Sequence, residues 1–347
     1  ALVEKSGANL SRTEEKLVEM SNGCICCTLR EDLLEQVREL SNENKFDYLL
    51  IESTGISEPL PVATTFDFRD EEGESLSDVS RLDTMVTVVD AANILNNYSS
   101  KDFLKDKGES AGEEDDRTLV DLLVEQIEFA NVIILNKLDL ISKDQLKTVK
   151  ALIKGLNVKA KIIEATNSKV EMKEVMDTGL YNLEDAQNHP LWVQELYNPG
   201  EHVPETEEYG ITSFVYRARE PFDPAKIYSF FNKEWPGVVR AKGFFWVATR
   251  PDFVGEVSQA GAFVRHQGIG RWWKAVPEER WPDSQEFRDA INNYWTEEYG
   301  DRRQEIVFIG IKNQMDENGI KKELDKLLVK NYLLNPEICH KLSDPFP

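Results

Sequence analysis

The chain has 347 residues, of which 63 are acidic and 41 basic, so its formal charge near neutral pH is −22. This length predicts two domains, each large enough to bury its own core. The acidity and the lack of a basic patch argue against a nucleic-acid-binding protein. The longest apolar runs, such as residues 48–51 and 132–135, fall far short of the ~20 residues that cross a bilayer, so we expect no membrane partner.

The first half of the chain alternates short apolar runs with amphipathic stretches. The apolar runs predict buried strands at residues 46–52, 85–90, 132–136 and 161–165. Apolar residues at three- and four-residue spacing predict helices at residues 31–40, 119–129 and 143–156. This alternation indicates an α/β domain with a doubly wound, mostly parallel sheet, in which ligands bind beyond the carboxyl ends of the strands.

The second half differs in character and follows a segment rich in Pro, Gly and Glu at residues 198–209, which predicts a linker. Two acidic stretches before it, at residues 67–78 and 105–117, predict solvated loops. After the linker, aromatic and β-branched runs predict strands at 211–218, 243–249 and 305–311, and helices at 224–233, 284–294 and 316–329. Most of the tryptophans lie in this half, and aromatic clusters of this kind mostly form a core. The strands and helices together predict a smaller α+β domain.

Three of the four cysteines lie close together, at Cys24, Cys26 and Cys27, just before a helix expected to begin near residues 29–32. A helix N-terminus lowers the pKa of a thiol, and three thiolates can surround one soft or borderline ion such as Zn²⁺. Structural zinc sites have four ligands, so three leave a position open, as suits a metal in transit. A dithiol redox pair and packing as small apolar residues remain alternatives. Clustered thiols without a disulfide framework predict a reducing, cytoplasmic location.

The motif Asn136-Lys137-x-Asp139 stands at the end of the strand predicted for residues 132–136. A carboxylate such as Asp139 can accept hydrogen bonds from both the ring N1–H and the exocyclic amine of guanine, which adenine lacks. Asn136 can bond the ring or a neighbouring loop, and the Lys137 stem can lie against the base. Residues 165–169 are candidates for the last base-facing loop. A plain strand-end turn is the alternative interpretation.

A second candidate element is Glu52, which closes the strand predicted for residues 46–52 and is followed three residues later by Gly55. In phosphate-hydrolysing proteins a carboxylate at a strand end orients Mg²⁺ or its water. A glycine there lets a backbone N–H approach the γ-phosphate closely. Taken alone, this is better explained as an ordinary strand-to-loop turn, but a guanine motif on another strand favours a nucleotide site.

Along the chain, the order is the cysteine cluster, then Glu52 with Gly55, then the Asn136-Lys137-x-Asp139 (NKxD) motif. These three motifs in this chain order resemble those of the cobalamin-biosynthesis-W-like (CobW-like) family of P-loop GTPases, which includes zinc metallochaperones. Residues 211–217, 239–246 and 300–310 resemble the C-terminal domain of that family, so the likeness covers nearly the whole chain. Within the family, the sequence is most similar to the zinc-limitation branch of Gram-positive bacteria. The resemblance implies a GTPase domain over residues 1–197, the linker at 198–209 and the C-terminal domain over 210–347.

The resemblance also implies a function, with GTP, Mg²⁺ and Zn²⁺ as the bound groups. Cys24, Cys26 and Cys27 would carry the metal, Glu52 and Gly55 would act at the γ-phosphate and Mg²⁺, and Asn136, Lys137 and Asp139 would select guanine. Zinc would pass to client apo-enzymes in a step coupled to GTP hydrolysis. A zinc buffer or sensor without nucleotide turnover is the alternative, and homo-oligomerisation is left open.

One element of the family pattern does not occur in these 347 residues, the GxxxxGK[ST] phosphate-binding loop that precedes the family's CxCC motif, which is matched here by Cys24, Cys26 and Cys27. We therefore expect the chain to begin after that loop and its strand. That loop supplies the N–H cradle for the phosphates, a lysine and the hydroxyl on Mg²⁺. Residues 1–347 alone are accordingly expected not to hydrolyse GTP.

Overall fold

A computed structural model describes residues 29–52, 59–67, 69, 75–99, 118–182, 185, 190, 193, 210–334 and 336–347. The first half contains helices α1 (Leu29–Asn42), α2 (Pro59–Asp67), α3 (Ile94–Tyr98), α4 (Leu119–Glu128) and α5 (Lys143–Leu156), and strands β1 (Val86–Asp90), β2 (Val132–Asn136) and β3 (Lys161–Glu164). The second half contains strands β4 (Ile211–Ala218), β5 (Val238–Phe245), β6 (Phe253–Ala260), β7 (Phe263–Arg271) and β8 (Gln304–Ile311), and helices α9 (Pro224–Phe231), α10 (Gln285–Asn292) and α11 (Glu317–Leu327). None of the described helices is long and apolar enough to cross a membrane.

The first sheet is parallel, with the order β1-β2-β3, as the alternation of strands and helices predicts. β2 is buried almost throughout, which explains its continuous apolar sequence. Both helices that flank β2 in the chain begin with a capping box, in which a Ser or Thr and a residue three positions later satisfy each other's backbone N–H groups. Thr118 and Asp121 form this box on α4, and Ser142 and Gln145 form it on α5.

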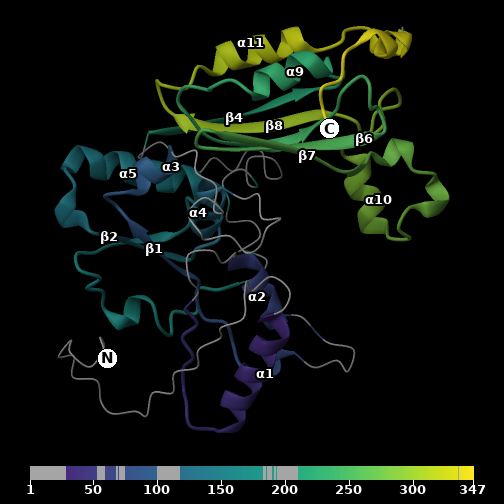
Figure 1. The fold of residues 1–347 in the computed structure, drawn as a ribbon. Coiled ribbons are helices and arrows are strands. Elements are labelled where there is room, and N and C mark those ends of the chain that lie inside the picture. The colour runs from purple at the N-terminus through teal and green to yellow at the C-terminus, as the bar shows by residue number, and fades with distance from the viewer. Residues whose placement is uncertain are drawn as a thin grey trace.

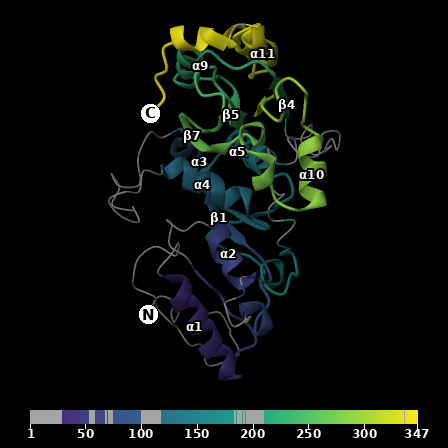
Figure 2. The same cartoon turned by 90° about the vertical axis from the view of Figure 1, so that its right-hand side faces the viewer.

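The second sheet has the order β4-β8-β5-β6-β7, and all its neighbouring strands are antiparallel. Figure 1 shows α9 and α11 over one face of this sheet, with α3, α4 and α5 on its other side. The view in Figure 2 shows the same order of layers. The aromatic side chains of α9, among them Phe230 and Phe231, pack with Phe308 of β8 in one buried cluster. The expected α+β arrangement of the second half is confirmed.

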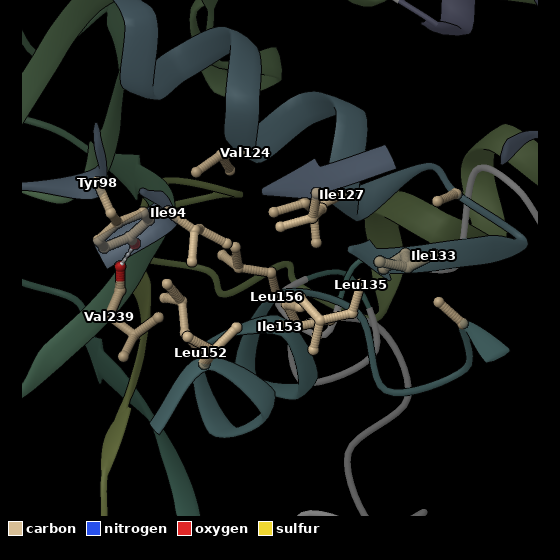
Figure 3. Packing of buried hydrophobic residues seen from close by; sticks show 14 of the residues in the cluster. Ile94, Tyr98, Val124, Ile127, Ile133, Leu135, Leu152, Ile153, Leu156 and Val239 are labelled. Atoms are coloured by element: carbon tan, nitrogen blue, oxygen red, sulfur yellow. Dashed lines mark hydrogen bonds between the residues drawn. The ribbon is translucent and has the colours of Figure 1, made fainter. Parts of the chain in front are cut away.

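The two sheets share a hydrophobic core, which lies around α3, α4 and α5 (Figure 3). Ile127 of α4 and Ile153 of α5 are fully buried there, and Val239 of β5 belongs to the same cluster. The Tyr98 hydroxyl, at the end of α3, donates a hydrogen bond to the carbonyl of Val239. The end of α3 is therefore tied to the middle of the antiparallel sheet.

The prediction of a buried strand at residues 46–52 is wrong. These residues have no strand conformation, and none of the described strands pairs with them. Leu50 is 82% exposed. An apolar run forms a strand only where a neighbouring strand completes its hydrogen bonds, and within the described parts of the chain β1 pairs with β2 alone.

Two other expectations need correction. The stretch 67–78 is not simply a solvated loop, because Ser75 caps a 3₁₀ turn whose Leu76 is fully buried against α1 and α2. The strand expected at 243–249 lies at 238–245. The residues after it bond to the segment before α9, where the Phe222 N–H donates to the carbonyl of Trp246. Strands β6 and β7 were not expected. The predicted loop 105–117 and linker 198–209 lie outside the described residues.

Candidate functional site

The carboxyl edge of the parallel sheet brings together the polar residues that close its strands. In the register of β1 and β2, Asp90 lies opposite Asn136, and the N–H of Ala91 bonds to the carbonyl of Asn136 at 3.0 Å. On the other side of β2, Leu135 lies opposite Glu164, the last residue of β3. The predicted guanine motif is therefore placed at the edge where ligands bind in sheets of this kind.

Asn136 holds the loop that follows β3. Its side chain is buried, its Nδ2 donates to Ser168 Oγ at 2.8 Å, and its Oδ1 accepts from the Ser168 N–H at 3.0 Å. Asn167 and Ser168 have φ values of 51° and 54°, in the left-handed region that non-glycine residues adopt rarely. The Asn136 amide thus compensates for an unfavourable turn and keeps residues 165–169 beside the motif.

Lys137 also has left-handed backbone geometry, with φ 63° and ψ 36°, and its side chain turns toward β1. Its Nζ lies 2.6 Å from Asp90 Oδ2. The same carboxylate accepts from the N–H of Ala92 at 2.9 Å and from Asn93 Nδ2 at 2.9 Å. Burial opposes ionisation of Asp90, but the hydrogen bonds from Lys137, Asn93 and the Ala92 N–H lower its pKa below the usual range.

Asp139 lies in the 3₁₀ turn Leu138–Leu140 directly after β2, and it is exposed to solvent. The N–H of Leu138 bonds to the carbonyl of Ala165 at 3.3 Å, which joins this turn to the loop held by Asn136. A ligand that approaches the edge can therefore reach the Asp139 carboxylate without displacing a buried side chain.

Glu52 is exposed at the end of the described segment 29–52. This segment is anchored further back, where the Tyr48 hydroxyl donates to Asp83 Oδ2 at 2.8 Å. Asp83 also accepts from the N–H of Gly179 at 2.6 Å, so it joins residues 46–52 to the loops around the parallel sheet. Gly55 lies outside the described residues.

The predicted metal ligands Cys24, Cys26 and Cys27 also lie outside the described residues. The helix expected after them is confirmed, because α1 begins at Leu29. Within the part of the chain that is described, no group of three or more His, Cys, Asp or Glu side chains could hold a metal ion. The fourth cysteine, Cys339, packs against the cluster around Trp246.

Sequence reasoning did not single out Asp90, and it included Ser168 only as a member of the candidate loop 165–169. Asp90 closes the apolar run 85–90 as Asn136 closes 132–136, so the rule that strand-closing polar residues mark the site would have identified it. No signal distinguishes Ser168 from the other residues of that loop. Its role follows from the tertiary contact with Asn136.

Comparison with known proteins agrees with the two-sheet organisation. Residues 2–164 match the family described as CobW/HypB/UreG, nucleotide-binding domain, and residues 211–328 match the cobalamin synthesis protein cobW C-terminal domain. The chain is 47% identical over 337 residues to zinc-regulated GTPase metalloprotein activator 1 of Dictyostelium discoideum, covering 95% of this chain and 70% of that protein. It is 30% identical over 252 residues to zinc chaperone CobW of Sinorhizobium sp, covering 69% of this chain and 67% of that protein.

Among solved structures, Zn(II)-bound YjiA GTPase from E. coli matches with 19% identity and a TM-score of 0.35, over 87% of this chain and 77% of that one. The decisive likeness is in sequence, since the match to the Dictyostelium protein runs through both halves of the chain. The chain belongs to the CobW family of GTPases, with both its nucleotide-binding domain and its C-terminal domain.

Proposed function

We propose that the protein is a GTP-dependent metallochaperone, which binds zinc through Cys24, Cys26 and Cys27 and transfers it to client apo-enzymes. The observation that carries this proposal is the arrangement of the NKxD motif at the carboxyl edge of the sheet. Asn136 tethers the neighbouring loop, the Lys137 side chain is held beside it, and the Asp139 carboxylate is exposed. An exposed carboxylate can accept hydrogen bonds from both the N1–H and the exocyclic amine of guanine, which supports the proposal.

The names of two relatives, a zinc-regulated GTPase metalloprotein activator and a zinc chaperone, support zinc as the metal. The three thiolates would leave one coordination position open for a ligand of the client, which suits transfer better than storage. Three further parts of this proposal rest on the sequence. They are a cytoplasmic location, a place in the family's zinc-limitation branch of Gram-positive bacteria, and the domain limits 1–197, 198–209 and 210–347.

Glu52 and Gly55 would act at the phosphate end of the nucleotide. The exposed Glu52 carboxylate offers hard oxygen ligands, which suit Mg²⁺ or a water bound to it. Bound Mg²⁺ would neutralise charge on the β- and γ-phosphates. Loss of the γ-phosphate would then alter the segment between the cysteines and Glu52, which changes the thiolate geometry and loosens the metal.

Guanine recognition is tested by Asp139→Asn in the full-length protein. The new amide group would face donors of the base, and such a mismatch costs about 1–3 kcal/mol, or roughly fivefold to more than a hundredfold in affinity for GTP. Affinity for xanthine nucleotides should rise relative to GTP. Glu171→Gln, at an exposed ion pair with Lys173, is the matched control and should leave both affinities unchanged. Equal binding of GTP and ATP by the unmodified protein would refute guanine selectivity.

Zinc binding is tested by Cys26→Ser and by the triple serine variant, in competition with a chromophoric chelator. A hydroxyl does not ionise near neutral pH as a thiol can, so Zn²⁺ affinity should fall strongly. Cys339→Ser is the matched control, because that thiol packs among apolar side chains away from the other three in sequence. Undiminished Zn²⁺ affinity in the triple variant would exclude the CxCC site.

The alternative, a zinc buffer or sensor without turnover, differs in its dependence on hydrolysis. Zinc transfer to a client apo-enzyme should require GTP, and a non-hydrolysable analogue should not replace it. Full transfer with the analogue would favour the buffer. Residues 1–347 alone, which contain no GxxxxGK[ST] motif, should bind zinc without hydrolysing GTP. Turnover by these residues that Glu52→Gln abolishes would contradict this expectation.

A further inference from the structure

The contact between Lys137 and Asp90 is not part of the NKxD pattern, and it joins two strand ends that are 47 residues apart in sequence. The Lys137 side chain is 48% exposed and that of Asp90 is 28% exposed, so the pair lies at the surface of the sheet edge. Surface ion pairs contribute about 0–1 kcal/mol to stability, so stability alone does not explain this contact. The contact fixes the direction of the Lys137 stem at the sheet edge.

Asp90 is a rigid anchor. One of its oxygens accepts from the N–H groups of Ala92 and Asn93, at 2.9 and 3.3 Å, and the other accepts from Asn93 Nδ2 at 2.9 Å. These bonds belong to the turn that leads from β1 into α3, so the carboxylate has a fixed direction. Burial opposes ionisation of Asp90, but the hydrogen bonds from Lys137, the Asn93 side chain and the Ala92 N–H lower its pKa below the usual range.

Lys137 is constrained at both ends. Its backbone has φ 63°, a conformation that costs an ordinary L-residue about 1–2 kcal/mol, and its Nζ is held by Asp90 at 2.6 Å. A free lysine side chain loses about 2 kcal/mol of rotamer entropy when it is fixed in one conformation. Here much of that ordering has taken place before a ligand arrives.

We propose that Asp90 is a positioning residue for base recognition, whose carboxylate holds Lys137 so that the lysine stem forms a prepared wall for the purine ring. This inference rests on the proposed function, because it assigns a partner to the guanine motif. The purine contacts the methylene groups of Lys137 on the exposed side, while the ammonium stays on Asp90. Preorganisation of this kind raises affinity by lowering the ordering that binding requires.

The test is a double-mutant cycle of Asp90→Asn and Lys137→Met in the full-length protein, with GDP and ADP affinities measured by calorimetry. Asp90→Asn retains an oxygen for the N–H groups of Ala92 and Asn93, so the turn before α3 is preserved. It removes the charge that holds the ammonium. Lys137→Met retains an apolar stem and removes that ammonium.

Asp90→Asn alone should weaken GDP binding by about three- to tenfold, the size expected when the ligand must order one additional side chain. In the Lys137→Met background the same change should leave GDP affinity unchanged. Glu171→Gln breaks an exposed ion pair with Lys173 and is the matched control, with no expected effect on GDP affinity.

The outcomes separate the two levels of the proposal. If the unmodified protein does not prefer GDP to ADP, guanine recognition fails, and the role of Asp90 fails with it. If GDP is preferred but Asp90→Asn weakens it equally with and without Lys137, Asp90 acts on the fold and not through the lysine. Tighter GDP binding by Asp90→Asn would mean that the lysine must leave Asp90 to bind nucleotide, which also overturns the inference.

Discussion

Arg240 of β5 and Glu128 at the end of α4 form an ion pair that joins the two halves of the molecule. The Nε–Oε1 distance is 2.8 Å, and the two side chains are only 5% and 3% exposed. The guanidinium also donates to Ser258 Oγ and to the carbonyl of Gln259, at 2.9 and 3.0 Å. The pair therefore connects a helix of the parallel sheet with two strands of the antiparallel sheet, inside their common core.

Glu128→Gln should destabilise the protein by about 3–5 kcal/mol, because it leaves the Arg240 charge buried without a counter-ion. The free energy of urea unfolding measures this loss. Glu171→Gln should cost less than about 1 kcal/mol, since its ion pair with Lys173 is exposed. The double variant Glu128→Leu with Arg240→Met should recover most of the stability, and failure to recover it would mean that the pair contributes more than its own desolvation.

A second contact across the same region depends on a glycine. Gly261, in the turn between β6 and β7, has φ +55°, and a Cβ there would clash with the backbone oxygen of Tyr98. Gly261→Ala should therefore cost about 2–5 kcal/mol in unfolding free energy, from backbone strain together with displacement of α3.

Gly179→Ala separates these two causes. Gly179 has φ +60°, and no atom lies within 4 Å of the point that a Cβ would occupy, so its substitution adds strain alone, at about 1–2 kcal/mol. Equal losses at the two glycines would show that α3 moves away from the turn without cost. A larger loss at Gly261 would show that close contact between α3 and the β6–β7 turn is under constraint.

The three strands of the parallel sheet could be located from apolar runs that close on polar residues, but only β2 is buried as predicted. Val86 and Val88 of β1 are 39% and 62% exposed, and no residue of β3 is buried. β2 is the clearest case, with Asn136 at its end. The run at 46–52 has the same composition but no strand, because composition records a preference for burial and not the presence of a partner. β7 shows the converse, since it is mostly exposed and rich in polar residues and glycine, and its pairing with β6 defines it.

The candidate site divides in the same way. Asn136 and Lys137 could be identified from local sequence because a short motif follows an apolar strand. Their partners Ser168 and Asp90 come from distant segments, and which side chains meet depends on the register of the three strands. A single sequence does not contain that register in any local pattern.

Asp83 should make the stability of the protein depend on acid pH. Burial raises the pKa of Asp83, but hydrogen bonds from the Gly179 N–H and the Tyr48 hydroxyl outweigh it and lower that pKa. Since the folded pKa lies below the unfolded value of about 3.9, this stabilisation is complete above that pH and is lost as the pH falls through the folded pKa. The difference in unfolding free energy between the unmodified protein and Asp83→Asn should shrink accordingly below about pH 4.

The partner of Asp83 gives the opposite sign at alkaline pH. Burial, followed by the hydrogen bond to Asp83, raises the pKa of Tyr48 to about 12. The protonated form is stabilised by folding, so this contribution is present below an unfolded pKa of about 10 and is lost as the pH rises through about 12. Tyrosinate absorbance, compared between the unmodified protein and Tyr48→Phe, measures this titration. A Tyr48 titration near pH 10 would mean that the contact with Asp83 does not form.

Asn136→Ala should loosen residues 165–169 and weaken guanine nucleotides together. Without the amide, the Ser168 N–H and hydroxyl each lose a hydrogen bond, and because Ser168 is exposed to solvent, water replaces part of each and the cost is about 0.5–1.5 kcal/mol per bond. Asn136→Asp should recover much of the loss, because a carboxylate still accepts from the Ser168 N–H and the serine hydroxyl can rotate to donate to its second oxygen. Hydrogen exchange at residues 165–169 and GDP affinity are the two measurements. If Asn136→Ala left exchange unchanged and weakened GDP alone, the asparagine would act on the base directly, and the loop would not depend on its amide.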